Sequence, residues 1–407
     1  MLKNLVLLSF LLIVITSRSV EALTYPIVGT NETIFYTNVM PCRTNPTKPT
    51  DAFYGQDAQF PSLKPAYKNN GDGTITDLNT GLMWVSARGN KTAVMPAISA
   101  VASFNLANYT DWRMPTIKEL YSLIQYTGKS ASTDAQCIPY IDTNYFEIVF
   151  GDVTGERVID GQDYSFNFYV SKVMGFQTAD FGTNFIDGRI KGYGLDLRDT
   201  NANDGKYVRY VRGPKNYGIN DFVLNNDSTI SDRSTGLMWT QYDSGFGMNW
   251  QSALAWVQTK NSQKYLNYSD WRLPNIKELQ SIVDYTRSPD TTNSAAISAL
   301  FNCSSIINEG GALDWPYFWS GTTHLDNMGA CYVSFGRALG WMKIGANSYY
   351  TLLDVHGAGA QKSDPKSGSP TSYPLGVDSN NNTIYGLGPQ GDILRINNYV
   401  RMVRTIN

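Results

Sequence analysis

Aromatic side chains late in the sequence are the residues best suited to ligand chemistry. Exposed Trp and Tyr rings can stack on the apolar C–H faces of sugars, while polar neighbours fix the orientation of the ligand. The segment 345–398 is rich in Gly, Ser, Pro and Asn, which is typical of a long loop, and long loops on a rigid scaffold often carry binding sites. The sequence therefore predicts a ligand-binding region there, with the candidate residues Trp315, Tyr317, Trp341, Tyr349, Tyr350 and His356.

Two runs of acidic and amide residues offer calcium a set of hard oxygen ligands at alternating positions. They are DTNAND at 199–204 and DSNNN at 378–382. Neither run has the glycine and glutamate spacing of an EF-hand, and both precede expected strands, where Asp and Asn also favour turns. We therefore expect turns and no cofactor; the residues of the calcium alternative are Asp199, Asn201, Asn203, Asp378 and Asn380.

Catalytic motifs find little support in this chain. The sequence contains no HExxH, no GxSxG and no P-loop, which are the usual marks of metalloproteases, α/β-hydrolases and nucleotide-binding enzymes. His324 and His356 are its two histidines among 407 residues, so a nucleophile–base pair is hard to assemble. We expect a binding protein and not an enzyme.

The N-terminus predicts export. Lys3 precedes an apolar run at 5–15, and Val20 and Ala22 stand at the small-residue positions before a cleavage site. The run is too short to span a bilayer, which needs about 20 residues. We expect a signal peptide at 1–22, no transmembrane segment, and a secreted, periplasmic or outer-surface location in a bacterium.

Charge and cysteine content add two expectations. The net charge is −2, and loss of the signal peptide, whose Lys3, Arg18 and Glu21 carry a net +1, leaves −3. Nucleic-acid binders usually show a basic face, so we expect no nucleic-acid partner. Four cysteines in an exported chain usually form two disulfides. Of the three possible pairings, we favour those that stay within one half of the chain: Cys42 with Cys137, and Cys303 with Cys331.

The chain carries an internal repeat. Three blocks recur in the same order: 69–84 with 225–239, 108–127 with 267–286, and 207–213 with 399–405. The second copy has about thirty extra residues late in the repeat, as the spacing between the blocks shows. This duplication predicts an N-terminal extension at 23–52, a first domain at 53–214 and a second domain at 215–407, and we expect the second half to fold alone.

The repeated blocks also predict local structure. Thr116 with Glu119, and Asn275 with Glu278, have the spacing of a capping box and predict a helix start in each copy. Short strands should flank the helices, and the aromatic segments from 316 to 344 should form one antiparallel sheet with the last strand. The GLMW tryptophans should be buried and the DWR triplets should tie loops together, which gives a structural role to Trp84, Trp239, Asp111, Trp112, Arg113, Asp270, Trp271 and Arg272.

Several segments resemble a known bacterial family. FYGQDAQ, NGDGTITDLNTGLMW, DWRMPTIKEL, FWSGTT, HGAGAQKSDPK and YVRMVR are similar to the family named for the C-terminal domain of the Legionella collagen-like adhesin. The resemblance implies an α+β fold: two tandem C-type-lectin-like domains, each with two helices, a small twisted antiparallel sheet and long loops. It also implies an adhesin-like protein that binds glycan or an extracellular or cell-surface protein. The alternative is a structural subunit of a surface fibre, and the oligomeric state stays open.

Overall fold

The computed structural model describes residues 23–169, 173–176, 178–195, 205–326, 328–345 and 349–406. The predicted signal peptide and the predicted calcium ligands Asp199, Asn201 and Asn203 lie outside the described residues. Within the described ranges, no helix is long and apolar enough to cross a membrane.

Each repeat opens with three short antiparallel strands that its own last strand completes. In both turns between the first two strands, an aspartate carboxylate accepts a backbone N–H two residues on, at Asp72 and at Asp227. Trp84 and Trp239 are fully buried in these sheets. The first sheet has the order β1-β2-β3-β7 and the second β20-β10-β9-β8; their bounds are β1 Tyr67–Asn69, β2 Thr74–Asp77, β3 Met83–Val85, β7 Val211–Arg212, β8 Phe222–Leu224, β9 Thr229–Asp232, β10 Leu237–Thr240 and β20 Val403–Thr405.

Two helices follow the opening strands in each repeat. The second helix begins at a capping box in both copies, because Thr116 and Asn275 accept the backbone N–H of Glu119 and Glu278 at 3.2 and 2.9 Å and the glutamates reach back, so this prediction is confirmed. The helices are α1 Val94–Val101, α2 Ile117–Ser122, α3 Trp250–Ser262 and α4 Ile276–Ser281; single 3₁₀ turns lie at Asp57–Gln59, Asp134–Gln136, Val173–Gly175, Tyr265–Asn267 and Pro370–Ser372.

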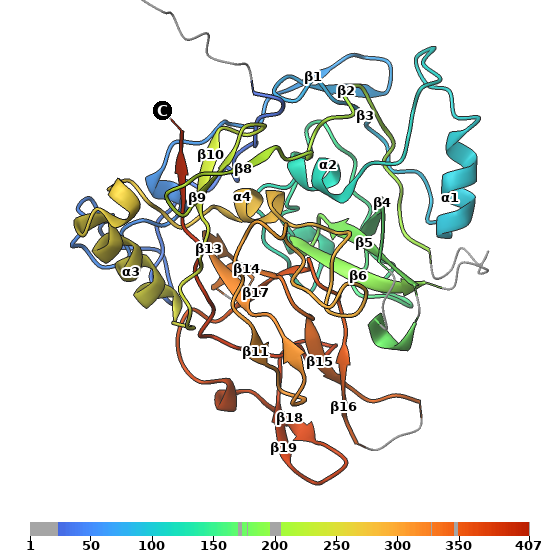
Figure 1. Cartoon of the computed structure of the whole chain (residues 1–407). Coiled ribbons are helices and arrows are strands. Elements are labelled where there is room, and N and C mark those ends of the chain that lie inside the picture. The colour runs from blue at the N-terminus through green and yellow to red at the C-terminus, as the bar shows by residue number, and fades with distance from the viewer. Residues whose placement is uncertain are drawn as a thin grey trace, which may run out of the picture.

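The two repeats share one central sheet of six strands (Figure 1). Its order is β13-β14-β17-β6-β5-β4, so each repeat contributes three adjacent strands. The repeats join where β17 pairs antiparallel with β6, at Gln361 and Ile190. The strands are β4 Gln162–Tyr169, β5 Thr178–Asn184, β6 Arg189–Leu195, β13 Tyr317–His324, β14 Gly329–Ser334 and β17 Gln361–Asp364.

A half-buried lysine, Lys118, and a buried one, Lys277, tie the repeats together above this sheet. The Nζ of Lys118 in α2 donates to the carbonyl of Ser281 at the end of α4 (2.6 Å), and the Nζ of Lys277 in α4 donates to the carbonyl of Ser122 at the end of α2 (2.8 Å). Each lysine thus satisfies a carbonyl left open at the other helix's C-terminus. Burial lowers the pKa of Lys118 to about 8 and that of Lys277 to about 7. One hydrophobic core also includes residues of both repeats, such as Ile117 and Ile276.

The late part of the second repeat forms three two-stranded sheets that project from one end of the molecule (Figure 1). They are β11 Ile306–Ile307 with β12 Leu313–Asp314, β15 Leu339–Met342 with β16 Thr351–Asp354, and β18 Pro374–Val377 with β19 Thr383–Tyr385. The prediction of one sheet from 316 to the last strand was therefore wrong. β13 and β14 belong to the central sheet, β15 pairs with β16 in a separate sheet, and β20 pairs with β10.

The predicted fold class was wrong as well. Among the described residues, twenty strands accompany four α-helices, and two of those helices have six residues each. The fold is β-rich with many small sheets, and does not fit an α+β pair of C-type-lectin-like domains. The sequence pattern overstated helix because the capping boxes mark where a helix starts but not how soon it ends.

The predicted disulfides are absent, since Cys42, Cys137, Cys303 and Cys331 are all free thiols. The two members of the second predicted pair lie in different surroundings. Cys331 is buried in β14 with Tyr126 and Glu32 nearby, whereas Cys303 lies beside Arg401 and Asp243. Cys137 accepts the backbone N–H of Ala131, and Cys42 lies near Lys366. Sharing a half of the chain did not bring the thiols together.

Candidate functional site

A groove of about 500 Å³ lies between the projecting end of the second repeat and its body. Its size falls within the range of ordinary ligand sites. One wall comes from β11, another from β15, and a third from β19 and the chain that follows it. The lining residues are Ile306, Ile307, Glu309, Pro316, Trp341, Pro370, Thr383, Ile384, Tyr385, Ile393, Leu394, Arg395, Asn397, Asn398 and Tyr399.

The backbone of two neighbouring segments holds Trp341 at this groove. Trp341 pairs with Leu352 across β15 and β16, and its N–H donates to the carbonyl of Gly391 at 2.9 Å. Gly391 has a φ of +57°, and a Cβ there would lie 2.3 Å from the carbonyl oxygen of Trp341, so the close approach requires glycine. The half-buried indole ring therefore has a fixed base and a face left for contact.

A charged pair fixes the polar side of the groove. The Nε and Nη2 atoms of Arg395 donate to the two carboxylate oxygens of Glu309 at 2.9 and 3.0 Å. The guanidinium carbon also lies 4.0 Å from the ring centroid of Tyr317, and that ring stacks on Tyr332 at 4.5 Å. The bidentate geometry and the stacking orient the remaining polar atoms of the pair.

The six predicted binding residues do not form one site. Trp341 lines the groove, and Trp315 lines a neighbouring hollow. Tyr349 is 40% exposed but away from the groove, and Tyr350 packs where a Cβ on Gly376 would lie. Tyr317 and His356 are buried. Strand alternation could not show which rings were free, because β13 is buried along its whole length.

The sequence singled out only Trp341 among the groove residues, and five polar or aromatic ones that it missed are Glu309, Tyr385, Arg395, Asn397 and Tyr399. The composition of 345–398 marked the right region, since three of the five lie within it. No spacing rule connects them to Glu309 or to Tyr399, because they meet only through the folding of the late insertion.

The sequence was compared with protein families, with curated proteins and with solved structures. The model of the Lcl C-terminal domain matches residues 73–212 and 228–353. The chain belongs to the Lcl C-terminal domain family, in two tandem copies. No curated protein and no solved structure matches. Membership in the family is consistent with an extracellular, adhesin-like protein, secreted or at the cell surface.

The second match of the Lcl C-terminal domain ends at residue 353. The groove wall formed by Thr383, Tyr385 and Arg395 lies after that point. The groove therefore combines a family scaffold, which carries Trp341 and Glu309, with a segment outside the matched residues.

The repeated DWR triplets hold the Lcl C-terminal domain scaffold together in the same way in both copies. Trp112 and Trp271 are buried. Arg113 and Arg272 bond the capping-box glutamates Glu119 and Glu278 at 2.7 and 2.6 Å, and Asp111 and Asp270 bond Arg212 and Arg404 near the chain's closing strands, each at 2.7 Å. These triplets fix the loop before each short helix to the last strand of the repeat.

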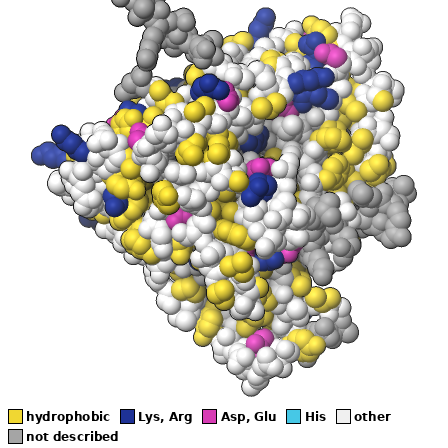
Figure 2. All heavy atoms as spheres, viewed as in Figure 1, with side chains coloured by type: hydrophobic (Ala, Val, Ile, Leu, Met, Phe, Trp, Pro, Cys, Tyr) yellow, Lys and Arg dark blue, Asp and Glu magenta, His cyan; other side chains and the backbone are white. Residues whose placement is uncertain are grey.

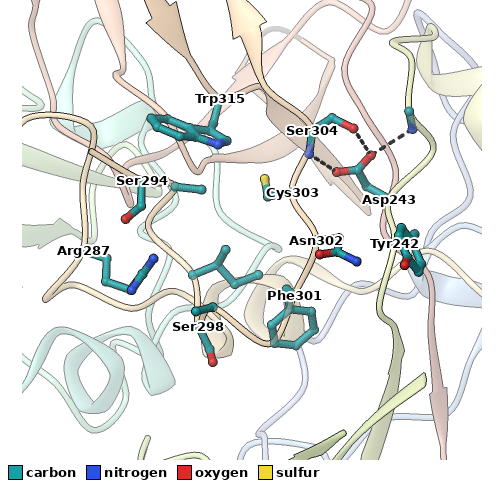
Figure 3. Close-up of a pocket in the computed structure, with 14 residues that line it drawn as sticks. Tyr242, Asp243, Arg287, Ser294, Ser298, Phe301, Asn302, Cys303, Ser304 and Trp315 are labelled. Carbon is teal, nitrogen blue, oxygen red and sulfur yellow. Dashed lines mark hydrogen bonds between the residues drawn. The ribbon is translucent and has the colours of Figure 1, made fainter. Parts of the chain in front are cut away.

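Trp315 lies in a second hollow of about 470 Å³, beside the groove (Figure 3). Ser294 and Arg287 lie along one flank of the hollow, and Ser298 and Phe301 lie across from Trp315. On the remaining side, the carboxylate of Asp243 accepts the N–H and the hydroxyl of Ser304, each at 2.7 Å. These two polar side chains are thus already bonded within the chain.

Both histidines are buried in polar surroundings. The Nε2 atom of His324 lies 2.9 Å from the carbonyl oxygen of Asp187, and that of His356 lies 3.1 Å from a carboxylate oxygen of Asp392. Burial lowers the pKa of each histidine to about 4. Both rings are therefore neutral at pH 7 and closed off from the groove.

These histidines predict a loss of stability in acid. Each histidine has a pKa of 6.5 in the unfolded chain and of about 4 in the folded chain. Its contribution to the free energy of unfolding is therefore complete above pH 6.5 and is lost as the pH falls to 4. The loss is at most about 3 kcal/mol per histidine. Urea unfolding between pH 7 and pH 4 should show a smaller loss in His356→Gln than in the unsubstituted protein.

The comparison between the two proteins is needed because other groups act in the opposite direction. Burial raises the pKa of Asp57 and of Asp364 to about 6, so their contribution grows as the pH falls from 6 to 4. These groups are the same in both proteins and cancel in the difference. Equal losses of stability in the two proteins would contradict a neutral, buried His356.

The second predicted calcium run forms a turn. One carboxylate oxygen of Asp378 accepts the backbone N–H groups of Asn380 and Asn382 at 2.9 and 2.8 Å. This turn joins β18 to β19. In the part of the chain that the structure describes, no three His, Cys, Asp or Glu side chains are grouped as metal ligands would be.

Proposed function

We propose that this chain is an exported surface protein that binds glycan in the groove at Trp341. The observation that carries the proposal is the groove itself, in which Trp341, Tyr385 and Tyr399 lie with the fixed pair Glu309 and Arg395. Aromatic faces suit the apolar faces of sugar rings, and the polar groups can bond their hydroxyls. The adhesin-type family supports an extracellular setting.

The charge of the protein favours an uncharged glycan. The chain has a net charge of −2, and Arg395 in the groove is already neutralised by Glu309. On the face shown in Figure 2, Lys and Arg side chains lie singly or in small groups, several of them beside Asp or Glu. Binding should therefore depend on stacking and hydrogen bonds, and should weaken only modestly between about 50 and about 500 mM salt.

A glycan array with the exported chain, followed by titration of the best glycan, tests this function. Trp341→Ala should weaken binding by roughly 5- to 150-fold, which corresponds to about 1–3 kcal/mol for a central aromatic anchor. Tyr349→Ala is the matched control, because Tyr349 is an exposed ring of the same region outside the groove. Circular dichroism should show the same fold for both variants. Binding by Trp341→Ala at full strength would refute the groove as the site.

A further inference from the structure

The N-terminal extension and the 3₁₀ turn Asp57–Gln59 that follows it fill a site on the second repeat. The segment runs along the side of the molecule that carries α3 and β13 (Figure 1). The carboxylate of Asp57 accepts hydrogen bonds from the hydroxyls of Thr322 in β13 (2.6 Å) and Thr30 (2.7 Å). The carbonyl of Thr30 accepts the N–H of Tyr126 at 2.8 Å. Two segments of the chain, one at Thr30 and one at the 3₁₀ turn Asp57–Gln59, are therefore held together between β13 and the loop after α2.

The internal symmetry defines the equivalent position on the first repeat. Asn167 corresponds to Thr322, because each side chain accepts the first N–H of the neighbouring short helix: Ile117 for Asn167 and Ile276 for Thr322. Tyr285 corresponds to Tyr126, because the two hydroxyls donate to the carbonyls of Gly359 and Gly188, the equivalent glycines before β17 and β6.

At the equivalent position the structure has a hollow of about 450 Å³. The chain that joins the two repeats supplies a counterpart for one contact of the extension: Lys118 donates to the carbonyl of Gly218 as Lys277 donates to that of Gly29. The hollow is lined by Thr116, Ile117, Lys118, Asn167, Lys215, Tyr217, Gly218, Ile219, Asn220, Phe222, Ile282, Val283, Asp284, Tyr285, Thr286 and Ser298.

The donors in the hollow that are equivalent to those of the occupied site have no acceptor among the described residues. Asn167 accepts through Oδ1, and its Nδ2 donates to no described residue. The backbone N–H of Tyr285 likewise has no acceptor among the described residues. Lys215 adds an exposed cation at the rim, and Ile219, which is 61% exposed, adds an apolar surface.

We propose that this hollow docks a short acidic segment of another protein, with a carboxylate held at Asn167 and Lys215 and a backbone carbonyl held at Tyr285. The occupied site on the second repeat shows the chemistry of such a ligand, since the carboxylate of Asp57 and the carbonyl of Thr30 make the equivalent contacts there from two neighbouring segments of the chain. The docking site lies on the first repeat and at the junction of the repeats, so it is independent of the glycan groove.

The test uses a labelled peptide with the sequence of residues 52–60, which contains Asp57, and the whole exported chain, whose own Thr30 and Asp57 fill the second site. The peptide should bind, and the same peptide with Asp57→Ala should bind at least about tenfold more weakly because the carboxylate is lost. In the protein, Lys215→Glu should reduce binding by a similar factor, and Thr286→Trp should abolish it by filling the hollow. Both positions are exposed, so circular dichroism should stay unchanged.

Three results would overturn the proposal. One is absence of peptide binding to the unsubstituted chain, and another is equal binding by that chain, Lys215→Glu and Thr286→Trp, which would place the peptide elsewhere. The third is self-association of the exported chain at micromolar concentration that Thr286→Trp removes, because a second copy of the chain would then be the occupant.

Discussion

Separate expression of residues 23–215 and 216–407 will give two halves without a cooperative thermal transition. Each half would expose one edge of the central sheet, at β6 or at β17. Each would also lose the carbonyl acceptor of its lysine, Lys118 or Lys277, which lies in the other half. An open sheet edge and an uncovered apolar core favour aggregation. The sequence repeat alone had suggested that the second half folds independently.

Differential scanning calorimetry and dye binding to exposed apolar surface will measure this effect. Co-expression of the two halves should restore one transition, because the contacts between the repeats need no covalent link. As a matched control, a protease site placed in the exposed linker at 213–216 should be cut after folding without separating the halves. A cooperative transition in 216–407 alone, near that of the whole chain, would show that the shared core is dispensable.

Local features of the fold were predictable because neighbouring residues determine them. The capping boxes at Thr116 and Asn275 and the burial of Trp84 and Trp239 depend on contacts within each repeated block. The match of the family to two segments confirms the repeat.

The association of the repeats was not predictable in the same way. In the sequence, Lys118 and Lys277 look like ordinary exposed helix residues, and only the approach of α2 to α4 makes them reciprocal donors. The six-stranded sheet depends on a single pairing between β6 and β17, which no local pattern encodes. From the sequence, β13 is expected to be an aromatic strand with one free face, but the structure buries it along its whole length.

The candidate site shows the same division. Trp341 could be selected from its residue type and its position beside a long insertion. Arg395 and Glu309 could not, because 86 residues separate them. Their pairing depends on how the insertion returns to the body of the repeat.

Arg401→Met and Arg209→Met will each reduce the free energy of unfolding by about 3–5 kcal/mol. Arg401 is fully buried and donates to the carbonyls of Thr240, Gln241 and Asn302 at 2.7–2.9 Å. Arg209 occupies the equivalent place in the first repeat, where it donates to the carbonyls of Val85, Ser86 and Glu147. Methionine fills part of the volume but leaves these buried acceptors without donors.

Arg212→Met provides the matched control, because Arg212 follows Arg209 by three residues in the same motif. Its partner Asp111 has a side chain that is 61% exposed, so loss of that pair should reduce the free energy of unfolding far less than loss of Arg209. Urea unfolding of the three variants measures the difference. A similar loss of unfolding free energy in Arg209→Met and Arg212→Met would mean that water replaces the buried guanidinium. The repeated arginine would then not be the residue that joins the last strand of each repeat to the neighbouring strand and loop.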